Sequence, residues 1–523
     1  AYRSLIVLVD AGVPVDDLTR GNVDYYGGAY GPAVEALYRD INAHPTHSGD
    51  AHYYAGLAHL AAGSPGLAAT QFRVLVETHP ENEHWGDGWM GWAQALAAQG
   101  DVDGAVQTYR TFAATAPDHP RAPEALWAAA GLLERAGRAD EAADLYEAVH
   151  RTFPTSDYAP PALLRGGLQR YRQGAADAAV ADWRALVDGY PQSAYRAAGF
   201  LWLGKAYLAA GQTLSATDAL RQAVQADPTG YYGLRAADLL ADPNALPFPP
   251  VRYAPARETP QMRAEAEAWL AARLGISPDR LGEPDAALLS DPRLARGLEL
   301  WRLGRPEEAK GELEALRQAT AGDALTQYRL ALLFREIGLY RSSILAAATV
   351  LRLTGTSPLD APPFLARLAY PTYYEDLIGA EAEREGLSPL LLFALVRQES
   401  LFEAVATSSA AAHGLMQVIP STGEYIAGQL GWPPNYRTAD LYRPCVSVRF
   451  GVWYLARQRD RFGRLDAALA AYNGGPTNAQ RWLDAAGEDA DMFLEQITLG
   501  ETRLYLQRIR EHYAVYTALY GGP

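Results

Sequence analysis

The 523-residue sequence contains little cysteine, no long apolar run and no excess of positive charge. The single cysteine, Cys445, excludes an intramolecular disulfide framework, and we expect this lone thiol to be buried. Apolar runs such as residues 390–396 fall far short of the roughly 20 residues that cross a bilayer, so no transmembrane segment is predicted. Residues 1–12 lack a basic stretch followed by a long apolar core, and we therefore expect any export signal to be absent from this chain.

The charge balance argues against several classes of protein. With 46 basic and 61 acidic residues the net charge is -15, whereas a nucleic-acid binder normally presents a basic face to neutralise phosphates. Hydrophobic residues make up 49% of the chain, which is typical of an ordered globular protein. The length suggests about three domains.

A repeat runs through the first half of the chain. Glycines recur at intervals of 37 residues, at Gly63, Gly100, Gly137, Gly174 and Gly211, each within a pattern of helix, glycine turn and helix. One such pair is too short to bury its apolar side alone, so the pairs are expected to stack into a superhelix. The repeat resembles the tetratricopeptide class, and both a docking surface for peptide or glycan and a purely structural arm remain open.

Proline-rich breaks divide the rest of the chain. Prolines forbid regular helix in residues 243–260, helical pairs resume around Gly304 and Gly338, and a second break covers residues 355–364. We predict a mainly all-α protein with three parts. These are a TPR-like superhelical domain (1–245), a helical linker domain (246–355) and a C-terminal domain (356–523).

One carboxyl stands out in the C-terminal domain. Ser388 can cap a helix that continues over residues 389–402, and Glu399 falls on the apolar face of this helix beside Leu395. Burial there would raise the pKa of Glu399 and keep it protonated near neutral pH, as a general acid requires. The alternative is a structural glutamate paired with a backbone amide or with Arg397.

Four short motifs follow one another in this domain: Glu399-Ser400, GLMQ at 414–417, AYNGG at 471–475 and ETRLY at 501–505. Together they resemble the soluble lytic transglycosylases of glycoside hydrolase family 23, over about 155 residues that end at the C-terminus. Large members of that family carry an N-terminal helical superhelix and a linker domain. The resemblance therefore implies a lysozyme-like catalytic domain behind the helical arm.

The resemblance also implies roles for individual residues. Glu399 would be the catalytic acid and base, Ser400 would lie near the sugar N-acetyl group, and Tyr472 would lie against the catalytic carboxyl. Met416 would offer an apolar contact or core packing, and Ile419 stands where many relatives have methionine. The segment at 401–413 also departs from the family in lacking Asn-Pro. The implied substrate-binding residues are Ser400, Met416, Gln417, Ile419, Tyr472, Asn473, Glu501 and Tyr505.

Some of these residues can be interpreted without the family. Asp466 can cap a helix that stops at 473–475, which would point Tyr472 inward, either as a core tyrosine or as a ligand contact. Gly414 is expected to permit close backbone approach. Glu501 follows Gly500, so it could simply favour a helix N-terminus.

A second acid is missing from the expected site. Glu403 is nearest in sequence, but four residues along the same helix it would lie beside Glu399 rather than across a sugar, and we expect it to be solvated or salt-bridged. The family mechanism needs one acid, which cleaves the β-1,4 bond between N-acetylmuramic acid and N-acetylglucosamine of peptidoglycan and leaves a 1,6-anhydro end. It needs no metal or organic cofactor, and no cysteine–histidine ligand cluster is evident in the sequence.

Two other functions remain open: a hydrolytic muramidase of the same fold, and a non-catalytic peptidoglycan-binding scaffold. The expected partners are peptidoglycan glycan strands, with cell-wall synthesis or remodelling proteins on the helical arm and no nucleic acid. The chemistry implies a location in the periplasm or cell envelope.

Overall fold

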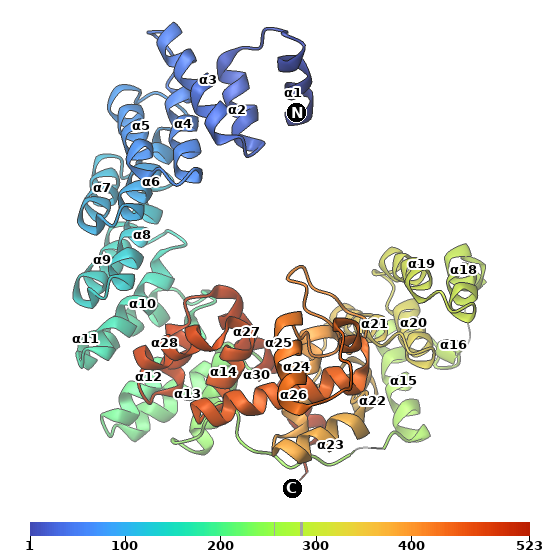
Figure 1. Cartoon of the computed structure of the whole chain (residues 1–523). Helices are drawn as coiled ribbons and strands as arrows, with labels where there is room; N and C mark the ends of the chain where they lie inside the picture. Colours follow the sequence, from blue (N-terminus) through green and yellow to red (C-terminus); the bar gives the residue numbers. More distant parts are fainter. Residues whose placement is uncertain (256, 283–285, 523) are drawn as a thin grey trace. The chain divides into compact units, whose positions relative to one another are not determined.

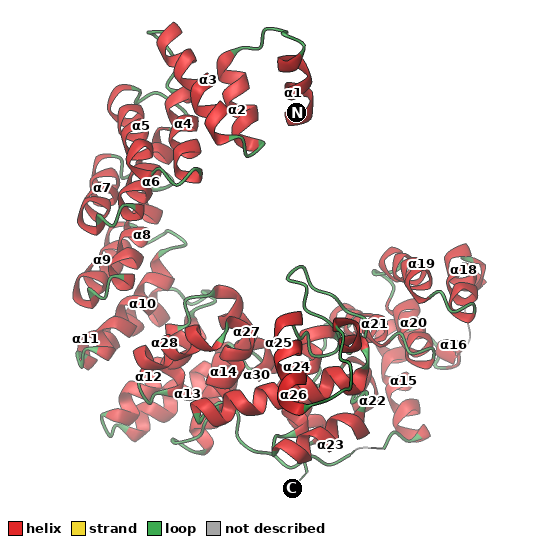
Figure 2. Ribbon diagram, in the orientation of Figure 1, coloured by secondary structure: helices red, strands yellow, loops and turns green. Residues whose placement is uncertain are grey.

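A computed structural model describes residues 1–255, 257–282 and 286–522. Over these ranges the backbone forms helices and isolated β-bridges but no strand (Figure 2). The prediction of an all-α protein is therefore confirmed. The chain divides into two compact units, Ala1–Pro228 and Thr229–Pro523.

The N-terminal unit is an array of helix pairs in which each pair lies beside the next (Figure 1). The glycines that mark the repeat, Gly63, Gly100, Gly137, Gly174 and Gly211, have φ angles of 73°, 86°, 75°, 81° and 71°. Glycine adopts this left-handed conformation without steric cost, which explains its regular place between paired helices and confirms the repeat. The helices are α1 (Tyr2–Asp10), α2 (Asp17–Tyr26), α3 (Tyr30–Ala43), α4 (Asp50–Ala61), α5 (Pro65–Thr78), α6 (Trp85–Ala98), α7 (Val102–Thr115), α8 (Ala122–Arg135), α9 (Ala139–Thr152), α10 (Ala159–Arg172), α11 (Ala176–Gly189), α12 (Arg196–Ala209) and α13 (Thr213–Ala226).

Close contact between neighbouring pairs builds the core of this array. Phe72 of α5 is fully buried between Gly56 of α4 and Gly91 of α6. A Cβ atom added to either glycine would come within 2.7 Å of the Phe72 ring. Each pair thus completes its apolar core only with its neighbour, as expected for a stacked repeat.

The C-terminal unit begins with α14 and ends with α30. One group of buried side chains joins α24 to α30, and a second lies among α15, α18, α19, α20 and α21. Its elements are α14 (Tyr231–Ala241), α15 (Pro260–Leu274), α16 (Asp279–Gly282), α17 (Ala286–Ser290), α18 (Pro292–Arg302), α19 (Pro306–Ala319), α20 (Ala324–Glu336), α21 (Tyr340–Leu353), α22 (Pro363–Ala369), α23 (Glu375–Glu385), α24 (Pro389–Ser400), α25 (Pro420–Leu430), the 3-10 helix η1 (Thr438–Tyr442), α26 (Pro444–Phe462), α27 (Leu465–Gly474), α28 (Pro476–Ala486), α29 (Ala490–Gln496) and α30 (Gly500–Tyr520).

The proline-rich segment that precedes α15 packs on the C-terminal unit. As predicted, its described residues form no helix. Phe248 is nevertheless buried, and Tyr513 of α30 donates a hydrogen bond to the carbonyl of Pro249 at 2.6 Å. The amide of Ala254 donates to the carbonyl of Tyr520 at 2.9 Å. These contacts make the segment part of the C-terminal fold, while the division into three domains stays a prediction.

A buried ion pair fixes α14 to the same unit. The Nε atom of Arg235 donates to Oδ1 of Asp491 at 2.6 Å, and these side chains are 3% and 2% exposed. Arg510 of α30 binds both carboxylate oxygens of Asp238 at 2.8 Å. Helix α14 is therefore held by charge pairs that water hardly reaches.

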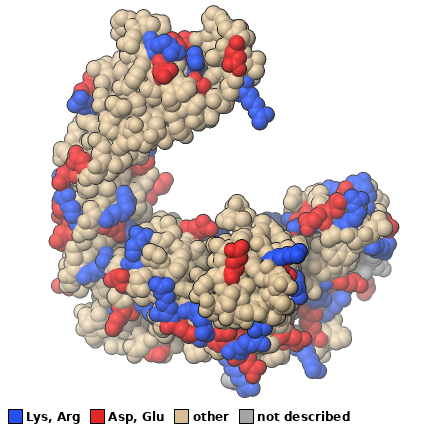
Figure 3. Space-filling view, in the orientation of Figure 1, with Lys and Arg blue, Asp and Glu red and all other residues tan. Residues whose placement is uncertain are grey.

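The surface and the helices bear on three further predictions. On the face drawn in Figure 3, acidic and basic side chains are interspersed over the described residues rather than gathered into one basic patch. No described helix has both the length and the apolar composition needed to cross a membrane. The prediction of a buried Cys445 is wrong, because this residue lies in the first turn of α26 with its side chain exposed.

Candidate active site

Helix α24 presents Glu399 at its C-terminal end. Residues 390–396 are fully buried, and Pro389 occupies the first turn, as predicted. Ser388 lies at the N-cap position, but its hydroxyl makes no capping hydrogen bond, which corrects that part of the prediction. The helix ends at Ser400 rather than at residue 402, because Leu401 and Phe402 adopt positive φ angles of 51° and 62° that no α-helix contains.

The carboxyl of Glu399 is half-buried and held by a tyrosine. The hydroxyl of Tyr505 on α30 donates a hydrogen bond to Oε1 of Glu399. Burial raises the pKa of Glu399 to about 8, although the Tyr505 hydrogen bond acts in the opposite direction. Desolvation dominates because it disfavours the charged form more than one neutral donor favours it. The carboxyl therefore keeps its proton at neutral pH.

Arg397 does not pair with this carboxyl. Its guanidinium lies over the ring of Tyr370 at 4.0 Å from the centroid, and it donates to the carbonyl of Ala369 at 2.5 Å. Arg397 is buried and directed toward the segment that follows α22. The structural ion pair considered for Glu399 is thus not formed with this residue.

Tyr472, at the end of α27, forms another wall of the site. Its hydroxyl donates to the carbonyl of Met416 at 2.7 Å. Burial raises the pKa of Tyr472 well above its ordinary value, and the nearby charge of Glu399 adds to that rise. Helix α27 ends at Gly474, and Gly475 at its C-cap has a φ of 86°, as the Gly-Gly sequence predicts. The Tyr472 hydroxyl thereby connects this helix end to the GLMQ segment.

Glycine is required at the start of the GLMQ segment. Gly414 has a φ of 76°, and a Cβ atom there would lie 2.0 Å from the carbonyl oxygen of Leu441. The segment is anchored at two more points. Ser400 donates to the carbonyl of Leu415 at 2.8 Å, and the Met416 amide donates to the Ser447 hydroxyl at 3.1 Å. Ser447 carried no recognisable sequence signal, since it lies inside the regular helix α26.

The predicted binding residues differ in the exposed fraction of their side chains. Met416 is fully buried against Gly451, so its side chain provides core packing, the second of its two interpretations. Ser400 is 4% exposed and its hydroxyl is directed to a backbone carbonyl. Ile419, in contrast, is 42% exposed immediately before α25.

The remaining predicted residues belong to the segment after Gly414 and to the start of α30. Gln417 adopts a φ of 47°, and its amide nitrogen donates to the carbonyl of Gly414 at 2.8 Å. Asn473 is exposed and accepts a hydrogen bond from Thr502 at 2.7 Å. Glu501 is exposed in the first turn of α30, the position favoured by a helix dipole. The structure thus brings Glu399, Tyr505 and Tyr472 together most directly.

Two acids occupy positions different from those expected. Glu403 lies beyond the end of α24, where it pairs with Lys310 and with Arg341 at 3.5 Å, so it is salt-bridged but does not follow Glu399 along a helix. Asp466 is not the N-cap of α27. The helix begins one residue earlier, and Asp466 forms an ion pair with Arg464 at 2.5 Å.

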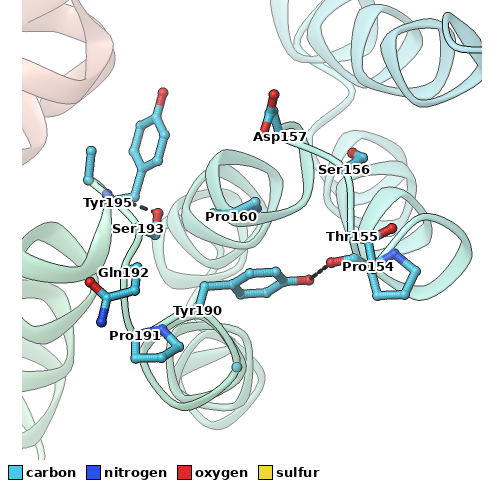
Figure 4. A pocket seen from close by; sticks show the side chains of 12 residues that line it. Pro154, Thr155, Ser156, Asp157, Pro160, Tyr190, Pro191, Gln192, Ser193 and Tyr195 are labelled. Carbon is cyan, nitrogen blue, oxygen red and sulfur yellow. Dashed lines mark hydrogen bonds between the residues drawn. The ribbon is translucent and has the colours of Figure 1, made fainter.

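A separate cavity of about 610 Å³ lies in the N-terminal unit, between the turns that precede α10 and α12 (Figure 4). The Tyr190 hydroxyl spans these turns and donates to the carbonyl of Pro154 at 2.7 Å. The cavity follows from the stacking of consecutive repeats. It is unrelated to Glu399, which lies in the C-terminal unit.

The fold and the site define a class: an all-helical protein in which repeated helix pairs precede a domain with one protonated carboxyl beside two tyrosines. Residues 376–492 match the family described as Transglycosylase SLT domain. Residues 90–157 and 294–358 match the family described as Tetratricopeptide repeat.

Known proteins with similar sequences are soluble lytic murein transglycosylases. That of Salmonella typhimurium is 32% identical over 155 residues, which cover 29% of this chain and 24% of the relative. That of Escherichia coli is 31% identical over 155 residues, with the same two coverages. The chain thus spans about a quarter of the length of the curated relatives it matches. The resemblance inferred from the four motifs is confirmed.

A solved structure extends the likeness to nearly the whole chain. The X-ray structure of an inactive mutant of the lytic transglycosylase Slt from Pseudomonas aeruginosa matches 98% of this chain and 85% of its own, with a TM-score of 0.61 and 20% sequence identity. At this identity the likeness shows the fold. The predicted combination of a helical superhelix and a lysozyme-like domain is confirmed.

Proposed function

We propose that this chain is a peptidoglycan lytic transglycosylase that cleaves the β-1,4 bond between N-acetylmuramic acid and N-acetylglucosamine. The observation that carries the proposal is Glu399, a carboxyl whose pKa of about 8 keeps it protonated while its side chain stays within reach of solvent. A general acid must hold its proton at working pH and must be able to touch the glycosidic oxygen. Glu399 holds its proton at neutral pH, and its partial exposure supports access to a glycosidic oxygen.

The hydrogen bond from Tyr505 supports an assignment of the two carboxyl oxygens. Because Tyr505 donates to Oε1, that oxygen acts as the acceptor and Oε2 carries the transferable proton. Oε2–H would protonate the glycosidic oxygen as the bond to C1 of the muramoyl sugar breaks, with the muramoyl acetamide supporting the developing positive charge. The carboxylate left behind would keep the Tyr505 bond, which favours the charged form.

The second half of the reaction needs no external nucleophile. The Glu399 carboxylate would remove the proton of the muramoyl C6 hydroxyl while that oxygen bonds to C1, so the 1,6-anhydro ring closes and the acid regains its proton. A tethered hydroxyl benefits from a high effective concentration relative to water. Glu403, the acid nearest to Glu399 in sequence, forms ion pairs with Lys310 and Arg341. These ion pairs support a mechanism that uses one carboxyl.

The masses of the products test this proposal. Digestion of purified sacculi with the full chain is expected to release muropeptides with 1,6-anhydromuramoyl ends, each lighter by one water than the hydrolytic product. Mass spectrometry of the soluble fraction distinguishes the two outcomes. Reducing muramoyl ends would instead indicate a hydrolytic muramidase, and absence of any released fragment would favour a non-catalytic scaffold.

The pH dependence gives a second prediction. Cleavage is expected to decline as pH rises through about 8, because the acid then loses its proton. The Tyr505 hydrogen bond lowers the pKa of Glu399, so Tyr505→Phe should raise that pKa and move the alkaline limb of the kcat/KM profile to higher pH. A limb that stays in place or moves to lower pH in Tyr505→Phe would contradict this coupling.

The proposal also includes the substrate, the location and the partners of the protein. Peptidoglycan glycan strands would be the substrate, bound by Gln417, Ile419, Tyr472, Asn473 and Glu501, and the protein would act in the periplasm or cell envelope. The tetratricopeptide repeats would serve as a docking surface for cell-wall synthesis or remodelling proteins. Repeat arrays offer extended surfaces of this kind.

A further inference from the structure

Three histidines of the N-terminal unit lie together although they are distant in sequence. His47 lies in the turn between α3 and α4, His52 lies in the first turns of α4, and His79 is the C-cap residue of α5. The ring centroid of His47 is 4.7 Å from that of His79 and 5.0 Å from that of His52. One nitrogen of each ring lies within 4.8 Å of the others. The distribution of histidine along the sequence is consistent with such a group, since six of the ten histidines fall between residues 44 and 84.

The backbone around these rings is closely packed. Gly49 has a φ of 100°, and a Cβ atom there would lie 2.9 Å from the Cβ of His79. Its amide donates to Nδ1 of His47 at 3.2 Å. Glycine therefore permits the turn to approach His79 and places the His47 ring beside it. An ion that binds Nδ1 of His47 would need to replace only this one long hydrogen bond.

A chain of hydrogen bonds orients the buried member of the group. The Nδ1–H of His52 donates to Oε1 of Gln71 at 2.7 Å, and Nε2 of the same amide donates to the Tyr38 hydroxyl at 3.2 Å. The Tyr38 hydroxyl in turn donates to Nε2 of His59 at 2.8 Å. All four groups are satisfied when the proton of His52 sits on Nδ1. The lone pair on Nε2 of His52 is then left available.

We propose that His47, His52 and His79 form a binding site for a divalent transition-metal ion of the Zn²⁺ type. Neutral imidazoles are preferred ligands of such ions, and a ligating histidine usually donates its other ring N–H to a carbonyl or carboxylate, as His52 donates to Gln71. Zinc would bind each nitrogen at roughly 2.0–2.1 Å with water as a fourth ligand, so the rings would close slightly around the ion. Asp50 interacts electrostatically with His79 and adds negative charge nearby.

A neighbouring group is a weaker candidate. Asp50, Glu83 and His84 also lie close enough to share an ion. However, the oxygens of Asp50 already accept hydrogen bonds from Ser48 at 2.9 Å and from Asn82 at 2.7 Å. The His84 ring is stacked on Tyr53 with centroids 4.0 Å apart. Binding there would compete with contacts that exist without an ion.

The proposed ion would be structural. It would join the turn between α3 and α4 to the end of α5 and so stiffen the first repeats of the array. The site lies in the N-terminal unit, whereas Glu399 lies in the other unit and its proposed chemistry uses no metal.

Isothermal titration of the chelator-treated full chain with ZnCl₂ tests the proposal. We expect one site per chain and a higher melting temperature of the N-terminal unit with zinc. His52→Ala should abolish the site, and Gln71→Met should weaken it about 10–100-fold because it removes only the orienting acceptor. Circular dichroism verifies that each variant is folded. His47→Ala, which changes a more exposed ring, replaces His52→Ala if the latter does not fold.

His84→Ala is the matched control and should leave zinc affinity unchanged. The proposal would be overturned by a wild-type chain that binds no zinc, or by histidine-triad variants that bind it as tightly as the wild type. It would also be overturned if His84→Ala abolished binding, because the ion would then be bound by Asp50, Glu83 and His84.

Discussion

Replacing Glu399 with glutamine is expected to abolish peptidoglycan cleavage while leaving the fold intact. Glutamine keeps the size of the side chain and can accept the Tyr505 hydrogen bond, but its amide N–H is far too weak an acid to protonate a glycosidic oxygen. Loss of a general acid and base typically costs about 10²–10⁴-fold in rate, and here the same group serves both half-reactions, so the loss should reach at least the upper part of that range. Release of anhydromuropeptides from sacculi measures the effect. Substantial residual release would reject the assignment of Glu399.

The stability of the same variant provides an independent check. The folded protein raises the pKa of Glu399 from 4.5 to about 8, so ionisation opposes folding increasingly as pH rises through this interval. Glu399→Gln should therefore be more stable than the wild type at pH 8 and nearly equal to it at pH 4, below the unfolded pKa. Thermal unfolding at the two pH values measures this difference.

Glu403→Gln is the matched control for Glu399→Gln. It removes a carboxylate that pairs with Lys310 and Arg341, so stability should fall while cleavage continues. A loss of cleavage in folded Glu403→Gln would mean that a second acid takes part.

Removal of residues 1–355 is expected to unfold the C-terminal domain, whereas removal of residues 1–228 should leave a folded unit. Fragment 356–523 loses Arg235 and Asp238, and with them the buried ion pairs to Asp491 and Arg510. Breaking a buried ion pair by deleting one partner costs about 3–5 kcal/mol. The free energy of unfolding of a domain is only about 5–15 kcal/mol, so the loss of two such ion pairs would approach the whole of that stability. Cooperative unfolding of fragments 229–523 and 356–523, followed by circular dichroism, compares the two.

A single substitution tests the contribution of the Arg235–Asp491 ion pair without deleting any other part of the chain. Arg235→Ala in the full chain should destabilise the C-terminal unit by several kcal/mol, about 3–5 by the same argument. Arg296→Ala breaks an exposed pair with Glu312 and should cost at most about 1 kcal/mol. Equal melting temperatures for the two variants, or an equally stable 356–523 fragment, would show that α14 is dispensable.

The features predicted correctly from the sequence depend on local rules. The glycines at intervals of 37 residues were recognisable because a left-handed residue between two helices strongly favours glycine. Helical spacing places Glu399 among buried residues, but only the four motifs together single it out as the candidate acid. The Gly-Gly pair marks the end of the helix that carries Tyr472, and the family resemblance adds its expected role at the site.

The features missed depend on tertiary contacts or on uncommon backbone conformations. Leu401 and Phe402 end α24 with positive φ angles that these residue types do not favour, so helical periodicity wrongly extends α24 to Glu403. Arg235, which pairs with Asp491, lies 256 residues away in α14, and no local sequence pattern indicates this contact. The histidine group was not predicted because stacking of the repeat, not spacing, brings His79 to His47.

The long separation between α14 and its partners also bears on the order in which the molecule can fold. Arg510 and Asp238 are 272 residues apart, so a growing chain exposes α14 until α30 has been made. The N-terminal repeats need only their immediate neighbours and can condense one after another during translation. The C-terminal unit can assemble only once α30 has been made, and non-local contacts of this kind form more slowly than contacts between neighbouring repeats.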